Sequence, residues 1–389
     1  MKEPVMSPHP SASDPRTRTR ARSAERNYHE TLVDMAVLWI TDCAKNGWTP
    51  ADLRHEFTAQ IDPLLFHALS SVTHNVPDKL LDHWFAGTRP GNVTSLGVGS
   101  LEKLVHQLSL LPPLRDWTVL TDPPSGEQEA EYLASLSPDQ RRAHDRIQAL
   151  LRKAESTTFE HEAEALLEKA ETLRQQYRVE VLLSGTYTEP TARQDVISTR
   201  VHLRAPWVRY QLRLLNTVSR AYSCEALLLT ESGIATVFGD PGDVAHVLDL
   251  FASLNRQREH FMRTAAGAKT AQEQGETSRY RRSFMVAYAS RIGTLLTRTR
   301  EDVLGNLAGD APMATDTVLP VLRHRAQQSQ ETLTRLFPRT RTMSVSATHH
   351  GGYRDGYTAA GRAHLGGDST GITGQKMLST CDNQDGFPA

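Results

Sequence analysis

The apolar positions in the middle of the chain recur at helical spacing in two consecutive runs. The first run gives one stripe, made of Ile147, Leu150, Leu151 and Ala154. The second run turns another stripe inward, made of Ala163, Leu166, Leu167, Ala170, Leu173 and Tyr177, and leaves four acids in solvent, Glu160, Glu164, Glu168 and Glu171. Ser156, Thr157 and Thr158 break the pattern between the runs. Two amphipathic helices with so short a connection predict an antiparallel αα-hairpin over residues 137–185.

The hairpin sequence also resembles a known family. The pattern I-x-x-L-L-x-x-A-E-S-T, then H-E-A-E-A-L-L-E-K-A-E-x-L and a tyrosine, resembles domain of unknown function 2786, which occurs in bacterial and phage proteins. The matching residues are Ile147, Leu150, Leu151, Ala154, Ser156, Thr157, Glu162, Ala163, Ala165, Lys169, Ala170, Leu173 and Tyr177. The resemblance implies that the region after the hairpin is the α+β companion domain that often follows in this family. It implies an architecture and no reaction.

The N-terminal part divides into a polar arm and a helical region. Residues 1–27 are rich in Pro, Ser and Arg and predict a disordered basic arm, with Arg16, Arg18, Arg20, Arg22 and Arg26. Residues 28–117 carry short helical patterns, with Thr49 as a cap and Pro50 at a first helical position. Such patterns are also typical of a helix-turn-helix, but a small helical bundle is favoured. Residues 118–136, with repeated prolines and acids, predict a linker.

The region 186–365 alternates between strand and helix signals. Residues 195–203 alternate as a strand, and a helix is expected over 207–222. EALLLT and IATVFG predict a β-hairpin with Gly233 in the turn, after which Asp240 and Pro241 begin a helix. Long helices are expected at 243–264 and 278–302, then a loop at 303–317, a helix at 318–336 and a flexible tail at 366–389. Residues 349–363 are interpreted as a helix in which Gly356, Ala360 and Ala363 pack closely on another helix, with Ala287, Ala289 and Gly293 as candidate neighbours.

These elements predict a predominantly helical α+β protein. We expect an N-terminal helical bundle, a central αα-hairpin and a C-terminal domain in which helices pack on a small antiparallel sheet of about three strands. A chain of 389 residues is long for one core, which fits this division.

Composition adds limits on location. The three cysteines, Cys43, Cys224 and Cys381, are far apart and show no C-x-x-C spacing, which favours a reducing cytoplasm over a disulfide framework or a structural zinc site. No apolar run approaches the length of a membrane span. The net charge of −1 indicates no overall electrostatic attraction to nucleic acid or to a membrane.

Several motifs that suggest a cofactor or metal are incomplete. His161-Glu162 opens like a zinc-protease motif, but Ala165 stands where the second histidine is needed. GDPGD at 239–243 is explained by helix capping. The glycines near His349 and His350 lack phosphate-loop spacing, and these histidines with His364 have no credible further ligands. We therefore expect no cofactor and no metal.

The strongest candidate binding site is a basic cluster on the helix expected at 278–302. Between residues 195 and 345 there are 20 Lys/Arg against 14 Asp/Glu, whereas residues 127–190 hold 8 against 13. A cluster of arginines with an interleaved aromatic is typical of phosphate contact, so the candidate nucleic-acid-binding residues are Arg279, Tyr280, Arg281, Arg282 and Arg291. Pairing of these cations with the acidic hairpin of the same chain is an alternative that the sequence favours slightly.

The sequence contains no motif that fixes a reaction. The leading hypothesis is a non-catalytic cytoplasmic protein that binds a macromolecule, a nucleic acid or else a protein, and no membrane. The alternative is a hydrolase with a site between the hairpin and the α+β domain, with Cys224 as a candidate nucleophile and His202 as its base. Against that alternative, a cysteine that opens an apolar strand is usually buried and inert.

Overall fold

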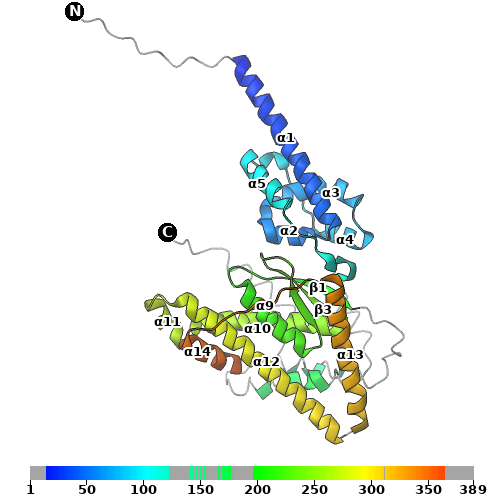
Figure 1. Ribbon diagram of the computed structural model, residues 1–389, viewed down its shortest axis with the longest axis vertical. Coiled ribbons are helices and arrows are strands. Elements are labelled where there is room, and N and C mark those ends of the chain that lie inside the picture. Colours follow the sequence, from blue (N-terminus) through cyan, green and yellow to red (C-terminus); the bar gives the residue numbers. More distant parts are fainter. Residues whose placement is uncertain are drawn as a thin grey trace, which may run out of the picture. The chain divides into compact units, whose positions relative to one another are not determined.

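The computed structural model describes residues 15–121, a set of positions between 138 and 178, and residues 196–310 and 312–363. The chain forms two compact units, Met1–Trp117 and Thr118–Ala389 (Figure 1). Each unit is described by itself.

The regular elements described in the first unit are all helices. The unit contains α1 (Pro15–Lys45), α2 (Pro50–Phe57), α3 (Asp62–Thr73), α4 (Asp78–Gly87) and α5 (Val98–Leu108), with short 3-10 turns at Thr58–Ile61 and Val93–Ser95. A third such turn, Arg115–Val119, spans the boundary at Trp117. Trp48 and Trp84 are fully buried, and the indole N–H of Trp84 donates to the Trp48 carbonyl over 3.2 Å. Thr49 caps α2 in a capping box with Asp52, and Pro50 follows at the first helical position, as predicted.

Helix α1 begins earlier than the sequence pattern indicated. Residues 15–27 continue the helix into the segment predicted as a disordered arm, although the described side chains of 20 and 22–27 are exposed and bury almost nothing. Arginine, alanine and glutamate are good helix formers, so these residues can extend a helix whose buried part starts at Leu32. Residues 1–14 of the predicted arm lie outside the described residues.

The second unit is built around a three-stranded antiparallel sheet of order β1-β3-β2. The strands are β1 (Ile197–His202), β2 (Glu225–Leu228) and β3 (Ile234–Gly239). Gly233 has a φ of +121° in the β2–β3 turn, where a Cβ would lie 2.2 Å from the Leu203 carbonyl oxygen, so glycine is required there. Leu120 adds a single parallel bridge to Ser198 on the outer side of β1.

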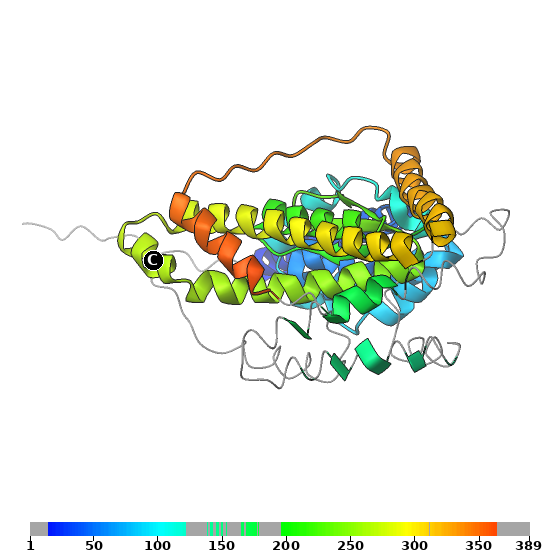
Figure 2. The ribbon, with the colours of Figure 1, turned by 90° about the horizontal axis from the view of Figure 1, so that it is seen from below.

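Helices cover both faces of the sheet. On one face Ala235 and Val237 join a core shared with α9 (Val208–Ala221), α10 (Pro241–Thr264) and α12 (Thr277–Asp310). On the other face Phe238 contacts Phe337, which follows α13 (Pro312–Leu336). Central strand β3 is therefore buried along its whole length. Figure 2 shows α12 and α10 running side by side, with α14 (His350–Gly361) across them. The short α11 (Ala266–Glu273) was not predicted.

The loop predicted over 303–317 is wrong. Helix α12 continues to Asp310 and α13 begins at Pro312, so the connection is one residue. Val303 is buried against Val318 and Leu322, which gives the end of α12 and the start of α13 an apolar contact of their own. This contact between two helices stabilises the helical form of a stretch that was predicted as a loop.

Helix α14 packs on α12 through glycines, as the sequence predicted. A Cβ on Gly352 would lie 2.4 Å from the Tyr280 carbonyl oxygen, and a Cβ on Gly356 would lie 2.2 Å from that of Phe284. One of the predicted neighbours of α14 is wrong, because Gly293 lies against Thr217 of α9 instead. The Ser283 hydroxyl accepts hydrogen bonds from the N–H groups of Thr348 and His349 and fixes the start of α14.

The described positions of the predicted hairpin are helical and share a small core. Ile147 and Ala170 are buried, and Leu150, Leu166 and Leu173 pack against them. The sheet, the helices around it and this helical segment confirm the predicted class, a predominantly helical α+β protein. Within the described residues, no helix combines the length and apolarity that crossing a membrane requires. The predicted tail, 366–389, lies outside the described residues.

Candidate functional site: a buried polar network and a basic helix surface

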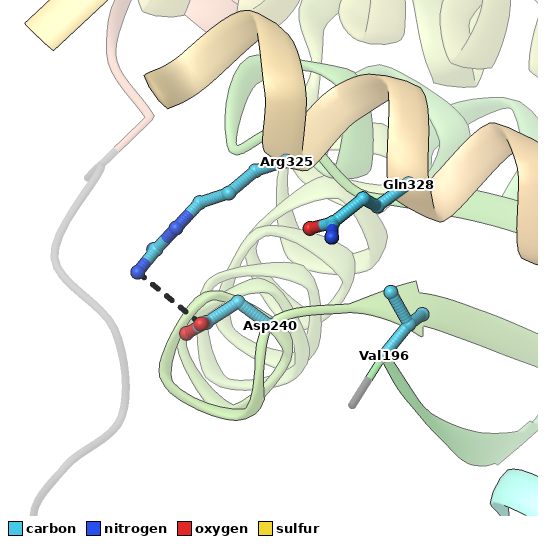
Figure 3. Close-up of a pocket in the computed structure, with 4 residues that line it drawn as sticks. All are labelled: Val196, Asp240, Arg325 and Gln328. Atoms are coloured by element: carbon cyan, nitrogen blue, oxygen red, sulfur yellow. Dashed lines mark ion pairs between the residues drawn. The ribbon is translucent and has the colours of Figure 1, made fainter. Parts of the chain in front are cut away.

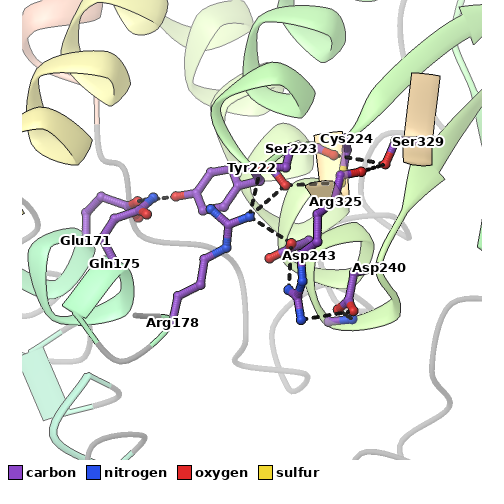
Figure 4. A network of polar contacts seen from close by, with 11 residues as sticks. Glu171, Gln175, Arg178, Tyr222, Ser223, Cys224, Asp240, Asp243, Arg325 and Ser329 are labelled. Atoms are coloured by element: carbon purple, nitrogen blue, oxygen red, sulfur yellow. Dashed lines mark hydrogen bonds and ion pairs between the residues drawn. The ribbon is translucent and has the colours of Figure 1, made fainter. Parts of the chain in front are cut away.

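A buried polar network joins the second helical segment of the hairpin to α9. Glu171 and Gln175 lie one turn apart, and the Gln175 amide donates to Glu171 Oε1 over 3.1 Å (Figure 4). The Tyr222 hydroxyl donates a short hydrogen bond to the same oxygen. His246 of α10 stacks edge-on against the Tyr222 ring, and its Nε2 atom lies 3.9 Å from Glu171 Oε2.

Glu171 corrects one prediction. The amphipathic pattern placed it in solvent, yet its side chain is fully buried. The helical period places glutamates on the solvent-exposed face. Glu171 is buried instead because Tyr222, which donates a hydrogen bond to it, and His246, which lies beside it, come from distant parts of the chain.

A second part of the network connects the hairpin to α10 and α13. The Arg178 Nη2 atom lies 2.8 Å from Asp243 Oδ2 and also donates to the Tyr222 carbonyl over 3.0 Å. Asp243 in turn accepts from Arg325 Nη1 over 3.1 Å, and Arg325 pairs with Asp240 over 3.2 Å. Asp240 caps α10 by accepting from the Gly242 N–H, so one aspartate both starts the helix and holds α13.

Burial controls the protonation of this network. It raises the pKa of Glu171, while the nearby Arg174 guanidinium opposes the rise. Burial lowers the pKa of His246 well below its usual range, and the charges of Arg174 and Arg178 lower it further. Burial likewise raises the pKa of Tyr222. His246 is therefore neutral at physiological pH.

The pocket beside Asp240 and Arg325 is small. It is lined by Val196, Asp240, Arg325 and Gln328 and has an empty volume of about 190 Å³, which includes open solvent (Figure 3). Pockets for small ligands begin at about 300 Å³. Within the described part of the chain, no group of three or more His, Cys, Asp or Glu side chains could hold a metal ion. The arrangement is suited to holding the hairpin on the α+β region.

The two catalytic candidates do not come together. His202 pairs with Ile234 at one end of β3, whereas Cys224 contacts Gly239 at the other end. His202 is exposed, and Cys224 is buried with a pKa raised well above its usual range by that burial. The two residues cannot form a nucleophile–base pair in this fold.

The predicted nucleic-acid-binding residues are spread over the first half of α12. Arg279 pairs with Glu276 over 2.7 Å at the surface. Arg282 is exposed and Arg281 half-buried, and neither forms an ion pair with another described residue. Tyr280 is 1% exposed, and its hydroxyl donates to Asp355 over 2.8 Å, so its ring belongs to the core. Among the hairpin acids, Glu171 turns to Tyr222, while Glu160, Glu162, Glu164 and Glu168 lie outside the described residues.

Arg291 lies beside aromatic residues that the sequence reading missed. Its guanidinium carbon is 4.9 Å from the centre of the Tyr357 ring. Tyr357 and Tyr353, one turn apart on α14, are 46% and 43% exposed. A signal was present in the sequence: the glycines at 352 and 356 mark the packed face of α14, which leaves the residue after each of them turned away from it.

The helical segment that carries Glu171 and Arg178 matches a described family model. Residues 142–181 match the family model "Protein of unknown function (DUF2786)". This match confirms the predicted recognition for that segment. That the following α+β region is the companion domain stays a prediction. No curated protein and no solved structure matches the chain.

Proposed function

We propose that this protein is a non-catalytic nucleic-acid-binding protein, and that it binds through the arginines of α12. The observation that carries the proposal is the state of Arg281 and Arg282, two consecutive arginines of α12, one half-buried and one exposed, that form no ion pair with another described residue. Such groups contact phosphates without first losing an internal partner.

The alternative, internal pairing with the hairpin, has less support. The described hairpin residues contribute a cation to the α+β region, Arg178, which pairs with Asp243. Glu171 is engaged by Tyr222 and Gln175. Within the described residues, the ion pair between the two parts therefore joins a hairpin cation to an acid of α10, and no described hairpin acid pairs with an arginine of α12.

The hydrolase alternative lacks a comparable observation. Its two candidates, His202 and Cys224, lie at opposite ends of β3, and the pocket lined by Asp240 and Arg325 is small, with an empty volume of about 190 Å³. A cytoplasmic location, expected from the widely spaced cysteines, is part of the same proposal.

A salt titration tests the proposal. The full-length protein is titrated into a fluorescent duplex and a fluorescent single strand at several salt concentrations. If phosphate contacts drive binding, the logarithm of the affinity falls linearly with the logarithm of salt, and Arg281→Ala with Arg282→Ala reduces that slope by about two. Arg335→Ala, an exposed arginine on α13, is the matched control and leaves the slope unchanged. If the protein binds neither probe at low salt, the proposal is rejected.

A further inference from the structure

We infer that the protein prefers single-stranded nucleic acid, and that bases stack on Tyr353 and Tyr357 beside Arg291. This inference rests on the proposed function and names its substrate class. The surface concerned, called the tyrosine face, consists of His350, Tyr353, Arg354 and Tyr357 on α14 together with Arg291 on α12.

The tyrosine face is exposed because the opposite face of α14 is committed to packing. Gly352 and Gly356 lie against the carbonyls of Tyr280 and Phe284, and Ala359 and Ala360 are buried. Residues one position after each glycine are rotated by about 100° from this contact. The two rings therefore stand on one side of the helix, and neighbours at this spacing have Cβ atoms about 5–6 Å apart. Two nearly half-exposed rings at that spacing suit two successive bases.

Arg291 makes one of the rings part of a mixed stacking surface. Its guanidinium lies over the Tyr357 ring at 4.9 Å, a cation–π arrangement. The Arg291 Nε atom is buried and has no hydrogen-bond partner among the described residues. Its charge is thus held by an aromatic ring and by no described carboxylate, which leaves a positive charge beside the exposed Tyr357 ring.

The charge of the tyrosine face is complementary to a polyanion. The only acid of α14, Asp355, points inward, where it accepts from the Tyr280 hydroxyl over 2.8 Å and from the Gly267 N–H over 3.1 Å. Arg354 is 73% exposed at its side chain, and its Nε atom lies 3.7 Å from Asp355. The described outer surface of α14 accordingly presents aromatic and basic groups without an open carboxylate.

These properties select single strands over duplexes. Bases in a duplex are already stacked and paired, so an exposed tyrosine on a convex helix cannot reach their faces. In a single strand every base offers a π-face, and stacking on an aromatic side chain is tolerant of sequence. A basic surface alone would bind duplexes equally well, which makes the rings the source of the preference.

The test compares three ligands with three forms of the full-length protein. The ligands are an oligothymidylate of about 16 nucleotides, an abasic oligonucleotide of the same length and charge, and a duplex. The proteins are the wild type, the double variant Tyr353→Leu with Tyr357→Leu, and the double variant Tyr353→Phe with Tyr357→Phe. The phenylalanine variant keeps the rings and is the matched control, and circular dichroism melting shows that all three are folded.

The expected result is selective. The leucine variant loses at least about tenfold in affinity for oligothymidylate, keeps its affinity for the duplex and the abasic strand, and the phenylalanine variant binds as the wild type does. If the wild type binds nucleic acid with salt dependence but the leucine variant binds oligothymidylate equally well, the inference is overturned and the proposed function stands. If the wild type binds none of the ligands, the proposed function fails, and the inference with it.

Discussion

Arg178 and Asp243 meet at 2.8 Å and are both largely buried, at 11% and 8% side-chain exposure. The arginine comes from the segment that matches the family model, and the aspartate comes from the first turn of α10. Asp243 also accepts from Arg325 of α13, so one carboxylate is shared by two guanidinium groups from different elements. We interpret this aspartate as the point at which the hairpin, α10 and α13 are fixed to one another.

Asp243→Ala is expected to destabilise the protein strongly. The substitution leaves the guanidinium groups of Arg178 and Arg325 buried without their shared carboxylate, and breaking a buried pair in this way costs about 3–5 kcal/mol. Urea unfolding followed by circular dichroism measures the loss. Arg279→Ala, which breaks the exposed pair with Glu276, is the control and costs less than about 1 kcal/mol. Equal effects of the two substitutions would contradict the structural role given to Asp243.

The same region shows what the sequence can and cannot predict. The caps at Thr49 and Asp240, the turn at Gly233 and the described part of the periodic stripes depend on neighbouring residues, and these predictions are confirmed. The burial of Glu171 depends on Tyr222 and His246, which are distant in sequence, and a helical period read along one segment cannot include them. The continuation of α12 past residue 302 likewise depends on Val318 and Leu322 of the next helix.

The predicted binding residues likewise divide into those that the sequence identifies and those that depend on packing. A run of arginines identifies a basic surface, because arginine rarely enters a core without a partner. It does not tell which aromatic residue of the region is exposed. Tyr280 is interleaved with the arginines yet buried, whereas Tyr353 and Tyr357 follow glycines that the packing of α14 uses.

Glu171→Gln is expected to change the pH dependence of stability. Burial raises the folded-state pKa of Glu171, so the folded protein holds a proton that the unfolded chain releases above about pH 4.3. In the wild type, Glu171 therefore lowers stability progressively as pH rises from the ordinary glutamate pKa to the raised folded value. The amide of the variant does not titrate. The stability difference in favour of Glu171→Gln should grow between pH 4 and the raised pKa and then level off.

Urea unfolding of both proteins at a series of pH values measures this difference. Glu331→Gln, which changes an exposed acid on α13, is the control and should run parallel to the wild type. If the stability advantage of Glu171→Gln instead shrinks with rising pH, the fold stabilises the charged carboxylate of Glu171 through Arg174. The folded-state pKa of Glu171 would then be lowered and not raised.

Gly356→Ala is expected to displace α14 from α12. The added Cβ would lie 2.2 Å from the Phe284 carbonyl oxygen, a backbone atom that cannot move aside without bending α12. Overpacking of this kind costs about 1–3 kcal/mol or more. Hydrogen exchange should then show faster exchange of the α14 amides. Gly361→Ala is the matched control on the same helix, because nothing lies within 4 Å of its Cβ position, and it should leave that exchange unchanged or slower.

Cys224 is expected to resist alkylation in the folded protein. It is 1% exposed, and burial raises its pKa well above the ordinary thiol value, so both access and the reactive thiolate form are suppressed. Cys43 is also buried, with a pKa raised to about 12 by that burial. Treatment with iodoacetamide at pH 7.5, followed by peptide mass spectrometry, should find both cysteines unmodified until the protein is unfolded in urea. Rapid labelling of Cys224 in the folded state would instead indicate an accessible, activated thiol and would restore the hydrolase alternative, since a nucleophile must reach its substrate as a thiolate.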